Sequence, residues 1–218
     1  MLQLHNTKSL FYKKYIAKID VNLSIASIFR NGNLQYVKEQ LDYMQMYADD
    51  GDTIPHPSPF IAKLSLKDFH RGLILYEALK GRTRTTTLRA EGFFLNVYSN
   101  DIDWLKSLAY EIDAYAMYLP QDKHVEYLKN NPNVVIEDNP QWKFKIWLGE
   151  NTQAGFAQFS KNNSNIRIGE KAVDSISRGY GGKGYYFWTN SEKYIDVAVL
   201  AGATIDRIIK YVSSSEIA

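Results

Sequence analysis

"LNVYSNDIDWL" (residues 95–105) and "YYFWTNSEKYI" (residues 185–195) align without a gap. In both stretches an aromatic residue, a small hydroxyl residue and Asn follow one another, and an aromatic–aliphatic pair comes after three intervening residues. Each stretch is typical of a strand that passes through a turn into a helix, and Asn100 is expected to cap the first of these helices. The alignment therefore indicates that a strand–turn–helix unit is repeated.

Two more pairs of similar stretches occur in the same order along the chain. "YIAKI" (15–19) matches "WKFKI" (142–146) in an aromatic residue, a Lys and an Ile. "IASIFRN" (25–31) matches "FAQFSKN" (156–162) in a bulky residue, Ala, a second bulky residue, a cation and Asn. Self-similarity that keeps its order is the signature of an internal repeat, so the sequence predicts a duplication.

The hydrophobic periodicity predicts a similar order of elements in the two halves. The first half is expected to contain strands at 11–21, 60–66, 85–99 and 114–120, and helices at 33–51, 65–81 and 101–112. The second half is expected to contain strands at 141–149, 165–169, 183–190 and 204–212, and helices at 152–162, 170–179 and 191–203.

This order predicts an α+β fold made of tandem, duplicated ferredoxin-like units, each with an additional helix. We expect antiparallel sheets that helices cover on one face. The expected boundaries are a first repeat at 1–129, a linker rich in turn-forming residues at 130–140, and a second repeat at 141–218. The alternative is one continuous sheet that both halves share.

The composition narrows the functional classes. The chain has 218 residues, of which 45% are hydrophobic and 14% aromatic, as in a packed globular protein. Its formal net charge is +2, which excludes an acidic nucleic-acid mimic and a highly basic coat peptide but not a local basic face. There is no Cys, so disulfides, thiolate catalysis and Cys-based metal sites are excluded.

The sequence has neither a signal-peptide pattern at its first residues nor a run of 18 apolar residues. We therefore expect a cytoplasmic protein without a membrane partner. Lys, Asn, Ile and Tyr are frequent, as in an AT-rich coding sequence of a phage or a low-GC bacterium. If the protein is encoded by a phage, the expected compartment is the host cytoplasm.

"RGYGGKGYYFWTN" (178–190) combines glycines, cations and aromatic residues. The glycines are interpreted first as the end of a helix and a turn that leads into a strand. A phosphate-binding loop with Arg178 and Lys183 is the alternative, although neither a Walker A motif nor GxGxxG is present. The sequence therefore gives no support for a nucleotide cofactor, and no cofactor is predicted.

The strand in this stretch resembles the aromatic signature of RNA-recognition motifs in its first residues, "KGYYFW". Tyr186 stands where that signature has a small residue, and Asn190 where it has the last aromatic residue, so the resemblance does not identify the family. On a strand, Tyr185 and Phe187 share one face and Tyr186 and Trp188 the other, and one pair has to meet the helices. The other pair would offer flat surface on which bases stack.

Several cations accompany these aromatic residues. Lys143 and Lys145 are expected on the strand beside it, and Arg167 on a neighbouring strand. A second basic stretch, "GRTRTTTLR" (81–89), is either a phosphate-gripping loop or a solvated loop that leads into a strand.

No catalytic or metal-binding constellation is visible. The four His residues show no short metal-ligand spacing, and the acidic stretch "ADDGD" (48–52) lacks the remainder of a calcium loop. No GxSxG motif is present either. No metal site and no catalytic residue are predicted.

The leading hypothesis is a non-enzymatic protein that binds RNA or single-stranded DNA through sheet aromatics and cations. The residues expected to bind are Tyr185, Phe187, Lys143, Lys145, Lys183, Arg178, Arg82, Arg84 and Arg89. The second hypothesis is a protein-interaction module, such as a phage assembly or host-takeover factor, that uses the same aromatic surface for a protein partner. The third is an enzyme with a site between the two halves. The oligomeric state does not follow from the sequence.

Overall fold

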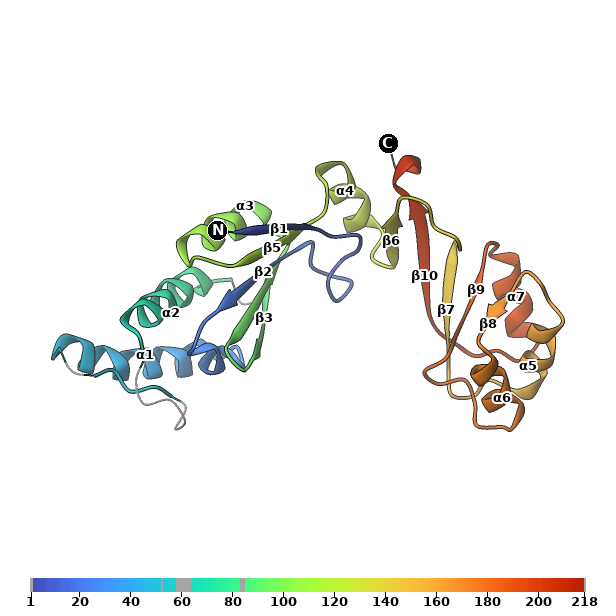
Figure 1. Ribbon diagram of the computed structural model, residues 1–218, viewed down its shortest axis with the longest axis horizontal. Helices are drawn as coiled ribbons and strands as arrows, with labels where there is room; N and C mark the ends of the chain where they lie inside the picture. The colour runs from blue at the N-terminus through green and yellow to red at the C-terminus, as the bar shows by residue number, and fades with distance from the viewer. Residues whose placement is uncertain (1, 52, 58–63, 83–84, 218) are drawn as a thin grey trace. The chain divides into compact units, whose positions relative to one another are not determined.

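The computed structural model describes residues 2–51, 53–57, 64–82 and 85–217 (Figure 1). The chain forms two compact units, unit 1 (Met1–Val125) and unit 2 (Glu126–Ala218). Each unit contains one five-stranded sheet together with helices. The predicted α+β class and its two-sheet repeat are confirmed.

Unit 1 contains the strands β1 (Gln3–Asn6), β2 (Ala17–Asn22), β3 (Thr86–Glu91), β4 (Phe94–Ser99) and β5 (Ala116–Leu119). Its helices are η1 (Ala26–Phe29), α1 (Leu34–Asp49), α2 (Leu66–Leu79) and α3 (Ile102–Glu111). The strand that we predicted over 60–66 falls for the most part on residues outside the described ranges, and Leu66 already belongs to α2. The helix α4 (Asp122–Asn130) spans the boundary between the units.

Unit 2 contains the strands β6 (Val134–Glu137), β7 (Phe144–Leu148), β8 (Arg167–Ile168), β9 (Tyr186–Thr189) and β10 (Ile205–Ser213). Its helices are α5 (Ala154–Lys161), α6 (Glu170–Ser177), α7 (Lys193–Leu200) and the short η2 (Ser214–Glu216). The segment 130–140, which we expected as a linker, includes β6, and this strand pairs with β10.

The two sheets have the same topology. Their strand orders are β1-β5-β2-β4-β3 and β6-β10-β7-β9-β8. In each sheet the first pair of that order is parallel and the other pairs are antiparallel, so the sheets are mixed and not wholly antiparallel as predicted. In unit 2, α5, α6 and α7 lie on one side of the sheet (Figure 1). We call the opposite side the open face.

The core of unit 2 follows from the alternation of β7 and the spacing of its helices. Phe144, Ile146 and Leu148 are buried, whereas the residues between them face the other way. Phe156 of α5 packs against Phe187 of β9 with ring centroids 5.3 Å apart. These side chains form one apolar cluster with residues of α6 and α7.

A pair of equivalent hydrogen bonds supports the repeat. The Asn100 side chain accepts from the backbone N–H of Ile16, and the Asn190 side chain accepts from that of Lys143, each at 2.9 Å. The donors Ile16 and Lys143 directly precede β2 and β7, and the acceptors Asn100 and Asn190 directly follow their partner strands β4 and β9. Each bond therefore joins the ends of two paired strands. The cap predicted at Asn100 was wrong, because Asp101 caps α3 by accepting from the N–H of Trp104.

The glycine-rich turn before β9 packs tightly against the end of β7. Gly181 has φ +73°, and a Cβ atom on it would lie 1.9 Å from the carbonyl oxygen of Glu150. A Cβ atom on Gly182 would lie 2.7 Å from the Leu148 side chain. The glycines therefore permit a close backbone approach, which favours the interpretation as a turn that leads into a strand.

We expect Gly181→Ala to lower the free energy of unfolding by about 1–3 kcal/mol more than Gly179→Ala. Both positions have positive φ, but a Cβ atom on Gly179 meets nothing within 4 Å, so the pair isolates the steric clash. Urea unfolding of both variants measures the difference. Equal losses of stability would contradict this packing role.

Candidate nucleic-acid interface

Four aromatic side chains lie in a row on the open face of unit 2. They are Trp147 of β7, Tyr186 and Trp188 of β9, and Tyr211 of β10. The ring centroids are 5.1 Å apart between Trp147 and Tyr186, 5.9 Å between Tyr186 and Trp188, and 5.3 Å between Trp188 and Tyr211. We call these four residues the aromatic row.

The pairing of β7 with β9 places this row on the open face. Trp147 is opposite Tyr186, and Lys145 is opposite Trp188. Between these two pairs lies the pair Ile146 and Phe187, which points to the opposite side of the sheet and is fully buried under the helices. Because strand residues point to opposite faces in turn, the aromatic row has to face away from the core.

Three cations lie along the aromatic row. The ammonium group of Lys145 lies 3.8 Å from the ring centroid of Tyr186 and about equally far, 4.9 and 5.1 Å, from those of Trp147 and Trp188. The guanidinium of Arg207 lies 5.2 Å from the Trp147 centroid. Arg167 of β8 lies opposite Trp188 of β9. Among the residues that the structure describes, none of these three cations forms an ion pair.

The surroundings of Lys145 disfavour its charged form. Burial lowers the pKa of its ammonium group, and the positive charge of Arg207 lowers it further. An anion on this face would counteract the shift, because its charge favours the protonated ammonium group. On the same face, burial raises the pKa of the Tyr211 hydroxyl, with a smaller contribution from Glu137.

The equivalent face of unit 1 is covered by its own chain. Phe11 and Tyr15 form an isolated β-bridge, and the turn between them includes Tyr12 and Lys13 at positive φ. The rings of Phe11 and Tyr12 pack on Tyr98 at centroid distances of 5.5 and 5.0 Å. As a result Tyr98, the counterpart of Trp188 in the repeat, is only 6% exposed.

The two faces also differ in charge. Lys18 of unit 1 corresponds to Lys145, but its ammonium group forms an ion pair with Asp20 at 2.9 Å. The register of the two sheets places Trp147 where unit 1 has Asp20. In the same way, Arg167 and Arg207 stand where unit 1 has Thr87 and Ala116. Unit 2 therefore has an open face whose three cations form no ion pair among the described residues, whereas unit 1 has a covered face whose lysine is paired with Asp20.

The aromatic pair expected to bind is the pair that faces the core. Phe187 is fully buried in the core, and Tyr185 packs against the same cluster. Phe187 therefore offers no ring surface to a ligand, and the open pair on β9 is Tyr186 and Trp188. The side chains "YYFW" are all aromatic, so the strand itself does not show which pair is inside.

The structure brings together only part of the predicted cation set. Lys145 lies on the aromatic row, and Lys143 is exposed just before β7. Lys183 lies 3.5 Å from Glu150, and Arg178 forms an ion pair with Asp174 at 3.0 Å, both in exposed turns around α6.

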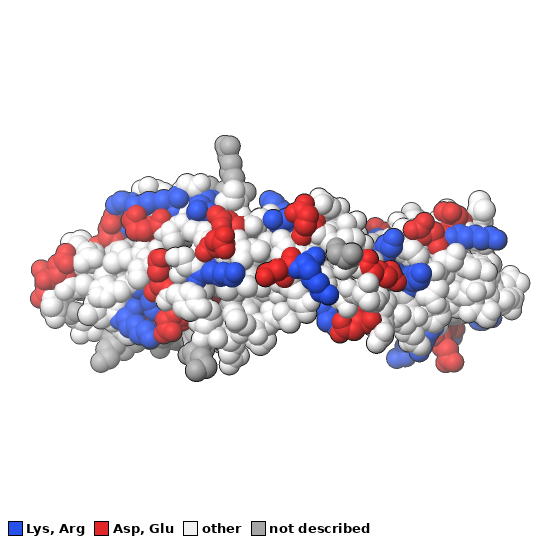
Figure 2. All heavy atoms as spheres, turned by 90° about the horizontal axis from the view of Figure 1, so that it is seen from above, with Lys and Arg blue, Asp and Glu red and all other residues white. Residues whose placement is uncertain are grey.

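The predicted arginines of the stretch 81–89 belong to unit 1. Arg82 forms an ion pair with Asp101 at 2.8 Å and lies over the ring of Trp104. Arg89 pairs with Glu91 at 2.5 Å. Arg84 lies outside the described residues. Figure 2 shows basic and acidic side chains interspersed over both units on the face in view, and no extended basic patch appears there over the described residues.

Sequence reasoning missed Trp147, Tyr211 and Arg207. A signal for Trp147 was present, because Phe144, Ile146 and Leu148 alternate with Lys145 and thereby place position 147 on the cationic side. Arg207 carried no such signal, because a register shift between Ile205 and Arg207 breaks the alternation of β10.

The described residues were also searched for a metal site and for a membrane-spanning helix. It contains no cluster of three or more His, Asp or Glu side chains that could hold a metal ion. No helix among the described residues is both long and apolar enough to cross a membrane. Comparison with protein-family models, with curated proteins and with solved structures finds no match for the chain.

We expect Arg207→Gln to raise the pKa of Lys145 towards that of an exposed lysine, because the substitution removes the neighbouring positive charge. Arg207→Lys keeps the charge and should leave this pKa low. NMR titration of the lysine side-chain signals measures both variants. An unchanged Lys145 pKa in Arg207→Gln would contradict the electrostatic coupling across this face.

Proposed function

We propose that the chain binds single-stranded nucleic acid, RNA or DNA, on the open face of unit 2. The observation that carries the proposal is the combination of the aromatic row with three cations that lack an acidic partner in the described structure. Rings on a sheet stack with bases, and cations between them attract the phosphates. The modest net charge of +2 suits a local contact of this kind more than a large basic surface.

The position of Lys145 suggests how a strand is accommodated. In the free protein its ammonium group lies over the ring of Tyr186, where a cation–π contact replaces an ion pair. A base that stacks on Tyr186 has to displace the ammonium group, which then turns towards a phosphate. Lys145 therefore contacts Tyr186 in the free protein and a phosphate in the complex. Lys143, which is exposed just before β7, adds a further cation beside Lys145.

We further propose that each unit is a ferredoxin-like unit with one added parallel strand at the edge of the sheet. In unit 1 the order from β2 to β5 is strand, helices, two strands, helix, strand. Unit 2 has the same order from β7 to β10, with α6 inserted between β8 and β9. In this interpretation β1 and β6 are the added strands.

We expect Trp188→Ala and Lys145→Ala each to weaken the binding of labelled single-stranded RNA and DNA. Loss of one stacked ring should cost about 1–3 kcal/mol of binding free energy. Loss of the cation should also reduce the slope of log affinity against log salt by about 1. Fluorescence anisotropy between about 50 and 200 mM salt measures both quantities.

Tyr180→Ala is the matched control for these variants. Tyr180 is 75% exposed in the glycine-rich turn of the same unit and lies outside the aromatic row, so its loss should leave affinity unchanged. Absence of binding by the unaltered protein at low salt would contradict the proposal. A protein partner, whose aromatic contacts depend little on salt, would then be the better explanation of the open face.

A further inference from the structure

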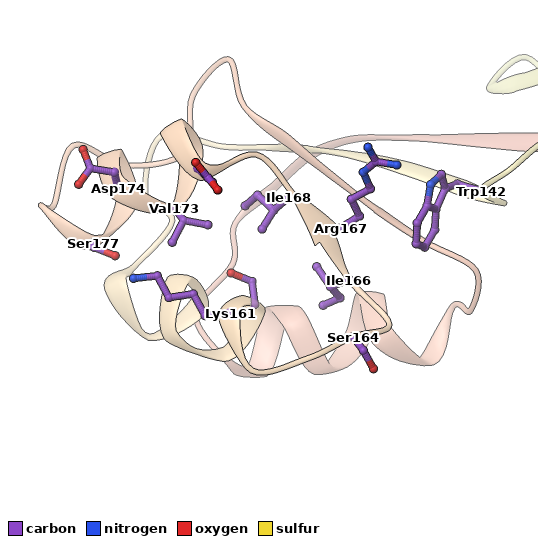
Figure 3. A pocket seen from close by; sticks show the side chains of 11 residues that line it. Trp142, Lys161, Ser164, Ile166, Arg167, Ile168, Val173, Asp174 and Ser177 are labelled. Carbon is purple, nitrogen blue, oxygen red and sulfur yellow. The ribbon is translucent and has the colours of Figure 1, made fainter.

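A pocket lies at the edge of the unit 2 sheet, between the end of α5, β8 and α6 (Figure 3). Its volume is about 670 Å³, within the range of small-molecule sites. Ile166, Ile168 and Val173 lie in its middle, and polar side chains surround them. We call this the edge pocket.

The edge pocket adjoins the aromatic row through two shared residues. Arg167 and Trp142, which lie together at one end of the edge pocket in Figure 3, also line a hollow that includes Trp188 and Tyr211. The two residues of β8 face opposite ways, since Arg167 is opposite Trp188 and Ile168 is opposite buried Phe187. β8 is the last strand at this edge of the sheet. Arg167 lies between the open face and the edge pocket, because it contributes to both hollows.

We propose that a single strand bound along the aromatic row continues past Arg167 and places one nucleobase in the edge pocket, and that this pocket prefers a base with an exocyclic amino group. The inference rests on the proposed function. It adds a site that selects the base to a face that binds without regard to sequence.

The chemistry of the pocket matches such a base. The apolar middle accepts the flat faces of the ring, and Arg167 and Lys161 at the rim attract the flanking phosphates. The carboxylate of Glu170 lines the pocket, and within the described residues it has no ion pair. A carboxylate accepts a hydrogen bond from the amino group of cytosine, whereas uracil presents a carbonyl at that position.

The test compares oligocytidylate with oligouridylate, in strands of about three and about eight nucleotides. The short strands occupy only the aromatic row and should bind with similar affinity. The long strands reach the edge pocket, where we expect oligocytidylate to bind about five- to tenfold more tightly than oligouridylate. Fluorescence anisotropy measures all four affinities.

Two substitutions fill the pocket from opposite walls. Ser164 and Ser177 are exposed lining residues, so Ser164→Trp and Ser177→Trp should each abolish the cytidine preference of the long strands. The affinity for short strands should stay unchanged. Gln158→Trp is the matched control, because Gln158 is exposed on α5 and does not line the pocket. Glu170→Gln should remove the preference without filling the space.

The outcomes separate this inference from the proposed function. Loss of the preference in both pocket variants, with short-strand binding retained, supports the edge pocket as a base site. Binding of all strands by the unaltered protein with no cytidine preference, or a preference that survives both Trp substitutions, overturns the inference and leaves the aromatic row in place. If no strand binds, both proposals are overturned.

Discussion

The antiparallel pairing of β7 with β9 is the constraint on which the rest of unit 2 depends. It joins Ile146 to Phe187 on one face and Lys145 to Trp188 on the other. A slip by one residue would exchange these faces, bury the lysine and expose the core. The bond from the Lys143 N–H to Asn190 closes the end of the same pair of strands, and the tight turn at Gly181 lies at the other end.

The two units share one topology but differ in the surface of the sheet that faces away from the helices. In unit 1, the equivalent register is kept, but the turn around Tyr12 covers the sheet and Asp20 neutralises Lys18. In unit 2, the aromatic row remains open, and Trp147 stands in place of the acid. The equivalent hydrogen bonds of Asn100 and Asn190 thus belong to the shared fold. The two faces differ in charge and in whether the chain covers them, and we place the function in this difference.

Much of the architecture could be predicted because it is encoded in local patterns. The alternation of β7 and the aligned stretches that end in Asn100 and Asn190 indicated the elements and their repetition. The orientation of β9 could not be predicted in this way, since Tyr185 and the first three residues of the strand are all aromatic and either alternating pair suits a core. It is decided by long-range packing, in particular that of Phe187 on Phe156. The register shift in β10 likewise concealed Arg207.

The four Trp residues, Trp104, Trp142, Trp147 and Trp188, allow a direct test of whether the open face of unit 2 binds nucleic acid. In an NMR titration with single-stranded RNA at low salt, each indole N–H gives its own signal. We expect the signals of Trp147 and Trp188 to shift and saturate, while that of Trp104 in unit 1 stays in place. Signals of Trp147 and Trp188 that stay unchanged up to an excess of RNA, or a shift of the Trp104 signal alone, would contradict binding on the open face.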